Sequence, residues 1–268
     1  MKIGFIGAGQ MATAIATGIC ATDQREIMAH DPGVEALARF QQVVESKGSK
    51  FYSVPNNLQL VNECEYIFIA VKPQHVEKAL HKIAIQHGSK SVFISMVAGI
   101  TCQSLQTLLG TSRVIRTMPN TPCLIGSGAI AVSNLENLDS DSVKFIKSLL
   151  VSVGSFEPIL ESDMNVVTGL SGSGPAYVYR MAEAMIQGGV AAGLDLESSS
   201  RLTLQTIYGA AKMMLEAGEE PAVLRERVSS PGGTTIAGLN ALKKGSFDSI
   251  IVEAIQAASL RASELSSI

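Results

Sequence analysis

The stretch KIGFIGAGQMATAIATG (2–18) decides the fold. Its first five residues form a short apolar β-strand pattern, and the glycine-rich segment GAGQMA (7–12) follows at once and opens a helical pattern. In this G-x-G-x-x-A arrangement Gly7 permits a tight turn, Gly9 lets the backbone approach a pyrophosphate, and Ala12 lets the helix pack close to the sheet. The amides and the dipole at the helix start then hold phosphate groups. Because the motif follows a strand and precedes a helix, it predicts a dinucleotide-binding βαβ unit.

The rest of the first 160 residues alternates short apolar runs with helical patterns. We expect strands at 2–6, 26–30, 66–70, 91–95, 113–117 and 129–133, and a last one near Phe156. The helices expected between them lie at 10–21, 34–42, 73–85, 101–109 and about 139–149. The runs YIFIA (66–70) and VFIS (92–95) are continuously apolar, as parallel strands covered on both faces are. The pattern predicts an α/β fold with a Rossmann-type doubly wound sheet built from right-handed βαβ units.

The strand patterns stop after about residue 160. Helical patterns follow at about 163–170, 175–192, 197–217, 222–228, 235–243 and 246–266. The helix at 175–192 carries only Arg180 and Glu183 as charges, and a helix that is apolar nearly all round must be buried on all sides. The remaining helices are too few to cover it, so a second subunit is its natural cover. We therefore expect a Rossmann domain at 1–160, an all-α dimerisation domain at 161–268, and an isolated subunit that is not stable.

Composition excludes several classes of partner. Only 17% of the 268 residues are charged, 46% are hydrophobic, and Trp is absent. The longest uncharged apolar runs, at 66–71 and 92–100, fall short of the roughly 20 residues that a membrane-spanning helix needs, so no membrane partner is expected. The net charge is −3 and the basic residues are scattered, so no nucleic acid partner is expected. Glycines interrupt the apolar N-terminus and argue against a signal peptide.

The cysteines and histidines show no metal-binding pattern. Cys20, Cys64, Cys102 and Cys123 contain no C-x-x-C pair, and no His lies near enough to complete a zinc site. We expect reduced cysteines that pack in the core of a cytoplasmic protein, and no metal.

The second expected strand ends at His30-Asp31, and Asp31 lies 24 residues after Gly7. An acid at this point accepts hydrogen bonds from the adenosine ribose 2′-OH and repels the 2′-phosphate of NADP, which favours NAD(H). Alternatively, Asp31 caps a helix that begins at Pro32.

The segments AVKP (70–73) and VAGI (97–100) also follow strands, and their small residues allow a nicotinamide ring to lie against the backbone.

Three further motifs are RTMPNTP (116–122), TGLSGSGPAYV (168–178) and VSSPGGTTI (228–236). In the last, a glycine turn at a helix N-terminus presents backbone amides as an anion nest, which suits a substrate carboxylate. Thr234 and Thr235 add hydroxyls there. Taken singly, each motif is also explained as a helix cap that contains Gly or Pro.

Together these motifs closely resemble those of pyrroline-5-carboxylate reductases. The resemblance runs over essentially the whole chain, from FIGAGQMA (5–12) through AVKP, AGI, MPNTP, LSGSGPAYV and GAAKM (209–213) to SPGGTTI. It implies a Rossmann domain followed by a helical domain that interlocks with a second subunit into a homodimer, and in some members a ring of dimers. The implied activity is hydride transfer from NADP(H) or NAD(H) to the C=N carbon of 1-pyrroline-5-carboxylate. The product is L-proline, and the reaction is the last step of proline biosynthesis.

The resemblance also implies the site residues. Those expected to bind the cofactor are Gly7, Ala8, Gly9, Gln10 and Met11 at the phosphates, Asp31, Pro32 and Asn57 at the adenosine, Ala70, Val71, Lys72, Pro73, Ala98 and Gly99 at the nicotinamide side, and Asn120 in a matching junction motif. Those expected to hold the substrate carboxylate are Ser230, Pro231, Gly232, Gly233, Thr234 and Thr235. Thr235 is expected nearest the ring nitrogen and is the candidate catalytic residue. The motifs place no His, Asp or Glu as a proton donor, and a protonated iminium needs only a hydride and correct orientation.

Asp31 is a departure from this family, which generally accepts NADPH and often NADH and commonly carries small hydroxyl residues at this point. We therefore expect use of both cofactors, with NADH relatively favoured.

One alternative function is that of a β-hydroxyacid-type dehydrogenase, which uses a Lys in the helix that follows its glycine motif. Here GPAYVYRMAEAM (174–185) has no Lys, and the nearest is Lys212. Another alternative is a non-catalytic dinucleotide-binding sensor, against which the intact AVKP, MPNTP and SPGGTT motifs argue.

Overall fold

The computed structural model describes residues 1–81, 83 and 90–266. The chain forms two compact units, one of Met1–Ser173 together with Gln256–Ile268 and the other of Gly174–Ile255. The last helix of the chain is thus divided between the units. The sequence pattern places a domain boundary after residue 160, where the strand patterns end and the helical patterns begin. That boundary stays a prediction.

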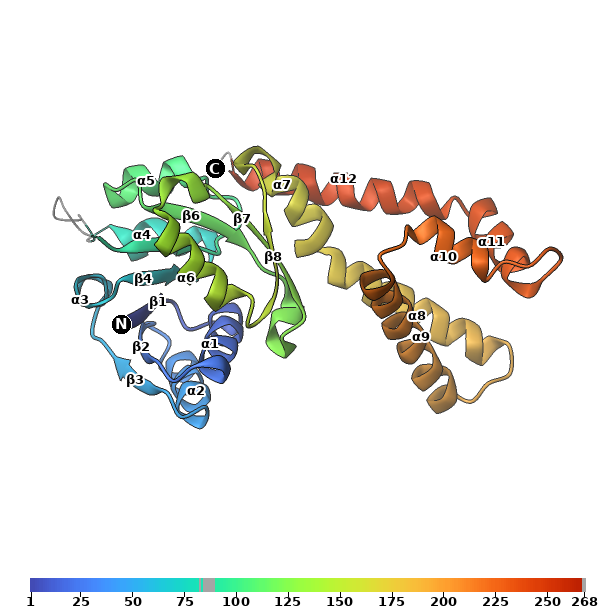
Figure 1. Cartoon of the computed structure of the whole chain (residues 1–268), viewed down its shortest axis with the longest axis horizontal. Helices are drawn as coiled ribbons and strands as arrows, with labels where there is room; N and C mark the ends of the chain where they lie inside the picture. Colours follow the sequence, from blue (N-terminus) through green and yellow to red (C-terminus); the bar gives the residue numbers. More distant parts are fainter. Residues whose placement is uncertain (82, 84–89, 267–268) are drawn as a thin grey trace. The chain divides into compact units, whose positions relative to one another are not determined.

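The described part of the first unit is built on an eight-stranded sheet in the order β3-β2-β1-β4-β5-β6-β7-β8 (Figure 1). Its parallel strands are β1 (Lys2–Ile6), β2 (Glu26–His30), β3 (Lys50–Ser53), β4 (Tyr66–Ile69), β5 (Val92–Ser95) and β6 (Val114–Met118). The strand order reverses between β1 and β4, and open α/β sheets bind ligands at such a switch point. The predicted Rossmann-type sheet is confirmed.

The far edge of the sheet departs from the expected parallel pattern. Strand β7 (Gly128–Ser133) is antiparallel to β6, and β8 (Gly154–Pro158) is parallel to β7. The connection from β6 to β7 holds only a short 3₁₀ turn, Thr121–Ile125, and a parallel crossover needs a dozen or more residues. The expectation of βαβ units throughout is therefore wrong at this point.

Two short elements were not expected from the sequence, namely β3 and α3 (Asn57–Glu63). Strand β3 is an edge strand whose residues are mostly exposed, so its sequence lacks an apolar pattern. Helix α3 has seven residues, too few for a helical periodicity to show. The helix expected at 73–85 appears as a 3₁₀ turn, Pro73–His75, followed by α4 (Val76–Leu80). Residues 82, 84 and 85 of that prediction lie outside the described residues.

Helices cover both faces of the sheet (Figure 1). One core contains Ile3 and Phe5 of β1 with side chains of α1 (Gln10–Thr22), α2 (Val34–Ser46) and α6 (Ser140–Leu150). The other contains Ile6 of β1 with side chains of α3, α4 and α5 (Cys102–Leu109). Successive residues of a strand point to opposite faces, so strands buried on both sides must be apolar throughout. This accounts for the continuous apolar runs in β4 and β5.

The four cysteines are free and buried, as the sequence predicts. Burial raises the pKa of the Cys64 and Cys102 thiols to about 12, and it also raises the pKa of Cys20 and Cys123. At neutral pH all four are therefore protonated thiols that pack as small apolar groups. Among the described residues, no three His, Cys, Asp or Glu side chains gather in a way that could hold a metal ion.

The second unit consists of helices. They are α8 (Gly174–Ala191), α9 (Leu196–Ala217), α10 (Pro221–Arg227), α11 (Thr234–Lys244) and the first part of α12 (Phe247–Ser266). Helices α8 and α9 lie side by side, and the Ser199 hydroxyl donates to the Ile186 carbonyl at 2.8 Å (Figure 1). Within one chain α8 buries Ala182, whereas Val178 and Tyr179 are 42% and 59% exposed. Within the described residues, no helix has the length and apolar character needed to cross a membrane.

The turn from β1 into α1 is held by close backbone contacts. The Gly7 amide donates to the His30 carbonyl at 2.9 Å, and Gly7 adopts a φ of +97°. A Cβ atom added there would lie 2.8 Å from the Ala70 carbonyl oxygen, at the end of β4. Gly9 differs, because its φ is −73° and an added Cβ would meet no atom within 4 Å. The first glycine is therefore required by the fold, and the second leaves open space beside the start of α1.

These contacts predict different effects for two matched substitutions. Gly7→Ala should lower the free energy of unfolding by about 1–3 kcal/mol, because its side chain meets the Ala70 carbonyl in a left-handed backbone conformation. Gly9→Ala should leave the thermal midpoint unchanged but weaken dinucleotide binding, because the motif predicts a pyrophosphate in that space. Thermal unfolding and titration calorimetry measure the two effects. Equal thermal midpoints for the two variants, or full dinucleotide affinity in Gly9→Ala, would contradict this account.

Candidate functional site

The residues predicted to hold phosphates lie where β1 ends and α1 begins. Gly7 and Ala8 are buried, whereas Gly9 and Gln10 are exposed at the helix start. The first four amides of a helix have no acceptor within it, and the helix dipole is positive at this end. The first turn of α1 carries no acidic side chain that would occupy those amides. The geometry therefore offers backbone donors to an anion.

Asp31 links this turn to the end of β2. Its Oδ2 accepts a hydrogen bond from the Ala8 amide at 2.7 Å, and its Oδ1 accepts one from the Gly33 amide at 2.7 Å. Helix α2 begins at Val34 with Gly33 as its N-cap, so the alternative of a helix that begins at Pro32 is wrong. The Asp31 carboxylate turns back onto the backbone two residues on, as Asp side chains do in turns. A negative charge thus lies directly beside the glycine turn.

A pocket of about 730 Å³ lies at the same edge of the sheet. Its lining residues are His30, Asn56, Asn57, Leu58, Gln74, Glu77, Lys78, Ala79, His81 and Ile83. The Asn57 side-chain amide donates to the Ala79 carbonyl at 2.9 Å, while its Oδ1 is buried without a hydrogen-bond partner. An unsatisfied buried acceptor is costly, so this oxygen is suited to a donor group on a ligand. The sequence predicted Asn57 but not the other lining residues, because they come from three separate segments, at 30, 56–58 and 74–83.

The residues predicted at the nicotinamide side follow β4 and β5. Ala70 and Val71 are half-buried, and Lys72 and Pro73 are exposed. The turn after β5, which we call the AGI turn (Ala98, Gly99 and Ile100), has Gly99 buried at a φ of +76°. An added Cβ at Gly99 would lie 3.2 Å from the backbone carbonyl of Leu265, in the last turn of α12. Packing against α12 therefore explains why this position is glycine.

Asn120 is engaged with backbone groups. Its side-chain amide donates to the Ser171 carbonyl at 3.1 Å, and its Oδ1 accepts from the Ala129 amide at 2.9 Å. The residue is 8% exposed. It ties the β6–β7 connection to the π-helical turn at Thr168–Gly172, which opens the TGLSGSGPAYV motif and overlaps its LSGSGP part (170–175). The structure thus gives Asn120 a role in fixing the junction, and its contact with a cofactor stays a prediction.

The predicted substrate residues lie in the second unit, in the loop at 230–235. The Gly233 amide donates to the Ser230 carbonyl at 2.9 Å, and Gly232 has a φ of +72°. Helix α11 begins at Thr234, one residue earlier than expected, with Gly233 as its N-cap. Thr234 is exposed and Thr235 is half-buried. The loop therefore brings a glycine turn, two hydroxyls and unpaired first-turn amides together, as an anion nest requires.

Two family models match the chain. The model described as "Pyrroline-5-carboxylate reductase dimerisation" matches residues 161–265, and the one described as "NADP oxidoreductase coenzyme F420-dependent" matches residues 2–99. The matches together cover the sheet as far as the AGI turn and nearly all of the helical part.

Curated proteins and solved structures agree with these matches. The pyrroline-5-carboxylate reductase of Arabidopsis thaliana is 39% identical over 265 residues, which cover 99% of this chain and 95% of that protein. The structure of a pyrroline-5-carboxylate reductase from Coxiella burnetii has a TM-score of 0.89 and 32% identity, with 98% of both chains covered. The structure of Plasmodium falciparum pyrroline carboxylate reductase with NADP bound has a TM-score of 0.85 and 32% identity, with 99% of this chain and 98% of that chain covered. The resemblance seen in the motifs is confirmed, and the chain belongs to the pyrroline-5-carboxylate reductase family.

Proposed function

We propose that this protein reduces 1-pyrroline-5-carboxylate to L-proline, the last step of proline biosynthesis. A hydride from NADPH or NADH reaches the C=N carbon, and the ring nitrogen of the protonated imine takes up the electron pair of the C=N bond. The observation that carries the proposal is 39% identity to a pyrroline-5-carboxylate reductase across 99% of the chain. The glycine turn, the AGI turn and the 230–235 loop are all present with suitable local geometry.

The residues present fit a nicotinamide dinucleotide, which supplies the hydride when bound. The start of α1 offers amides to the pyrophosphate beside Gly9, where space is open. The unpaired Asn57 Oδ1 suits a donor such as the adenine amino group. Asp31 is placed to accept from a ribose hydroxyl, because each of its oxygens has a further lone pair. The AVKP segment and the AGI turn then line the nicotinamide side.

The helical part supplies the substrate contacts in this proposal. The 230–235 loop holds the carboxylate through its amides and hydroxyls, and the Thr235 hydroxyl accepts a hydrogen bond from the N–H of the protonated ring nitrogen. Residues 1–160 thus serve as the dinucleotide-binding domain and 161–268 as the substrate-binding and dimerisation domain. Catalysis rests on the alignment of the two rings rather than on a strong acid, because the imine arrives protonated.

The two alternative functions are separated by one assay. A β-hydroxyacid-type dehydrogenase would need a catalytic Lys, and Lys212 instead lies on α9, 3.6 Å from Glu216. A sensor would bind the dinucleotide without turnover. Oxidation of NADPH or NADH that depends on 1-pyrroline-5-carboxylate, with L-proline as product, supports the reductase. Turnover of a hydroxyacid alone, or binding without turnover, would refute it.

The subunit arrangement is proposed as a homodimer through the helical part. The matching family model is described as a dimerisation domain, and α8 leaves Val178, Tyr179 and Met185 exposed in the single chain. A ring of dimers is the larger assembly that the resemblance suggests, and it would need contacts beyond this interface. The free cysteines are those of a reducing compartment, which supports a cytoplasmic location.

Cofactor preference follows from Asp31. Its charge should repel the 2′-phosphate of NADPH, so kcat/KM should be higher with NADH than with NADPH, with activity on both. Steady-state kinetics with each cofactor at saturating imine measures the ratio. Asp31→Ser should shift the ratio toward NADPH. A large NADPH preference in the unaltered protein would contradict the assignment.

Thr235 is expected to act in turnover rather than in cofactor binding. Thr235→Ala should lower kcat/KM for the imine, because the hydrogen bond to the ring nitrogen is lost, with the Kd for NADH unchanged. Thr234→Ala is the neighbouring control for the loss of a hydroxyl and should have the smaller effect. An unchanged kcat/KM in Thr235→Ala would refute this role.

Stability should depend on protein concentration, because the second subunit covers α8. The thermal midpoint should rise as the subunit concentration rises, since a dimer that dissociates on unfolding is stabilised by mass action. Differential scanning calorimetry from submicromolar to about 100 μM subunit covers the transition expected for a dimer of ordinary affinity. A well-folded monomer at micromolar concentration, seen by sedimentation, would count against this arrangement.

A further inference from the structure

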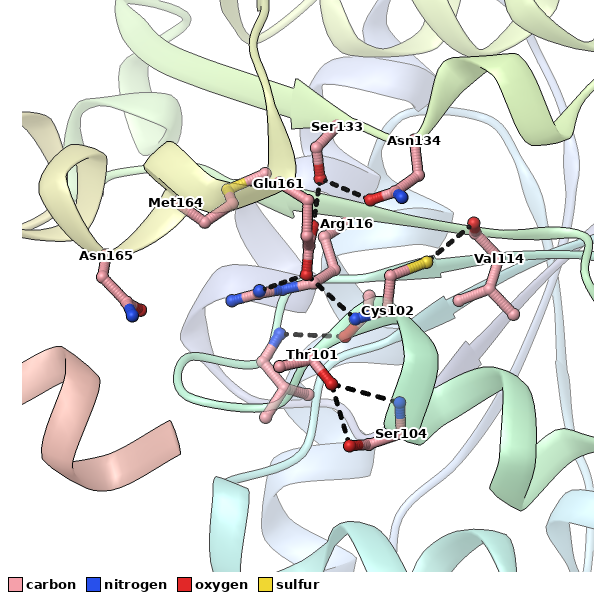
Figure 2. Close-up of polar contacts among 12 residues, drawn as sticks. Thr101, Cys102, Ser104, Val114, Arg116, Ser133, Asn134, Glu161, Met164 and Asn165 are labelled. Carbon is pink, nitrogen blue, oxygen red and sulfur yellow. Dashed lines mark hydrogen bonds and ion pairs between the residues drawn. The ribbon is translucent and has the colours of Figure 1, made fainter. Parts of the chain in front are cut away.

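The Glu161 carboxylate joins three segments of the first unit, and the function described above does not use it (Figure 2). Glu161 opens the 3₁₀ turn Glu161–Asp163, just after the last strand. Its Oε1 accepts hydrogen bonds from the Arg116 guanidinium at 2.6 Å and from the Cys102 amide at 3.0 Å. Its Oε2 accepts one from the Ser133 hydroxyl at 2.6 Å. One side chain therefore holds β6, β7 and the start of α5 together.

Arg116 makes this arrangement depend on charge. It lies on β6 within the RTMPNTP motif and is 3% exposed, and Glu161 is the anion with which it forms its ion pair. Its Nη2 is buried without a hydrogen-bond partner. Loss of Glu161 alone would leave a buried and uncompensated cation, which is strongly unfavourable. The ion pair therefore fixes the Glu161 side chain in place.

The Cys102 contact connects Glu161 to the nicotinamide side. Cys102 is the first residue of α5 and follows the AGI turn after one residue, Thr101. The Thr101 side chain caps the helix by accepting from the Ser104 amide at 3.1 Å, and Glu161 adds a charged acceptor at the Cys102 amide. The other side of the turn meets α12, where Gly99 packs against the backbone of Leu265. The AGI turn is thus held from both sides within one compact unit.

We infer that Glu161, held by Arg116, is a positioning residue for hydride transfer that fixes the AGI turn through the Cys102 amide and so sets the nicotinamide ring. This inference rests on the proposed function, because that function places the ring against the AGI turn. Glu161 acts through the backbone of the turn rather than on the cofactor itself. Transfer between two rings is sensitive to small displacements, so a shift of the turn should reduce turnover more than affinity for the adenosine half.

The test is Glu161→Gln in the full-length protein, which keeps the shape and removes the charge. We expect kcat to fall about tenfold or more, because misplacement by about 1 Å can cost as much as a hundredfold in rate. The primary isotope effect with cofactor deuterated at the transferred position should rise. The Kd for NADH should increase, while the Kd for ADP-ribose, which lacks the nicotinamide, should stay the same.

Asp139→Asn provides the matched control at the other end of β6. Asp139, the N-cap of α6, pairs at 3.1 Å with Arg113, the residue before β6, so the same chemical change breaks an ion pair away from the AGI turn. This variant should lose stability without a change in kcat, isotope effect or the ratio of the two Kd values. Equal kinetic effects in both variants would show that Glu161 acts on the fold in general, and would overturn the inference.

A second variant covers the case in which Glu161→Gln does not fold. Arg116→Met with Glu161→Leu removes both charges, and replacement of a buried pair by apolar residues is often tolerated. It still lacks the acceptor for the Cys102 amide, so it should show the same loss of kcat and the same rise in the ratio of the NADH to ADP-ribose Kd values. Wild-type values of both quantities in a folded variant would overturn the inference. A wild-type protein that does not turn over the imine would refute the proposed function, and the Kd ratio would still decide on Glu161.

Discussion

The close approach of β1 to β4 at Gly7 is the constraint on which the rest of the structure depends. The backbone of Gly7 lies against the Ala70 carbonyl, and its amide is bound to the carbonyl of His30 at the end of β2. Three strands therefore end at one point, and the sheet reverses its order there. Helix α1 can begin beside this point only because the turn is tight. The open space at Gly9, the Asp31 carboxylate and the pocket at Asn57 all follow from this convergence.

The low content of charged residues has two structural causes. In the first unit, β4 and β5 lie between helices on both faces, so neither strand has a side that faces water. In the second unit the apolar side chains of α8 find few partners within the chain, and Ala182 is its buried residue. The apolar excess of the first half is therefore satisfied inside one subunit. That of the second half is available for a partner subunit, in agreement with the dimerisation model that matches this part of the sequence.

Buried polar groups connect motifs that lie far apart in the sequence. Asn120 of the MPNTP motif binds the backbone of Ser171 in the LSGSGP motif, and Arg116 of the same strand-and-turn segment binds Glu161. In both links the side chain from the 116–122 segment, Asn120 or Arg116, is buried. The segment at 116–122 thus serves mainly to join the sheet to the first turns of the helical part. These links fix the position of the segment in the fold, and the contact of Asn120 with a cofactor stays a prediction.

The sequence by itself determined the features that neighbouring residues encode. The strand at 2–6, the glycine turn, the first helix (predicted at 10–21 and observed at Gln10–Thr22), the continuously apolar central strands and the long helices were all predicted. Steric limits at glycine and the periodicity of apolar residues act over a few positions, so neighbouring residues are enough to encode them. Only the tertiary structure decided the direction of β7 and the packing of Gly99 on Leu265. It also decided that the Asp31 carboxylate accepts hydrogen bonds from both the Ala8 and the Gly33 amides. It alone also paired Arg116 with Glu161, which are 45 residues apart. Such contacts depend on where distant segments meet in the folded chain, and no local pattern in one sequence specifies that meeting.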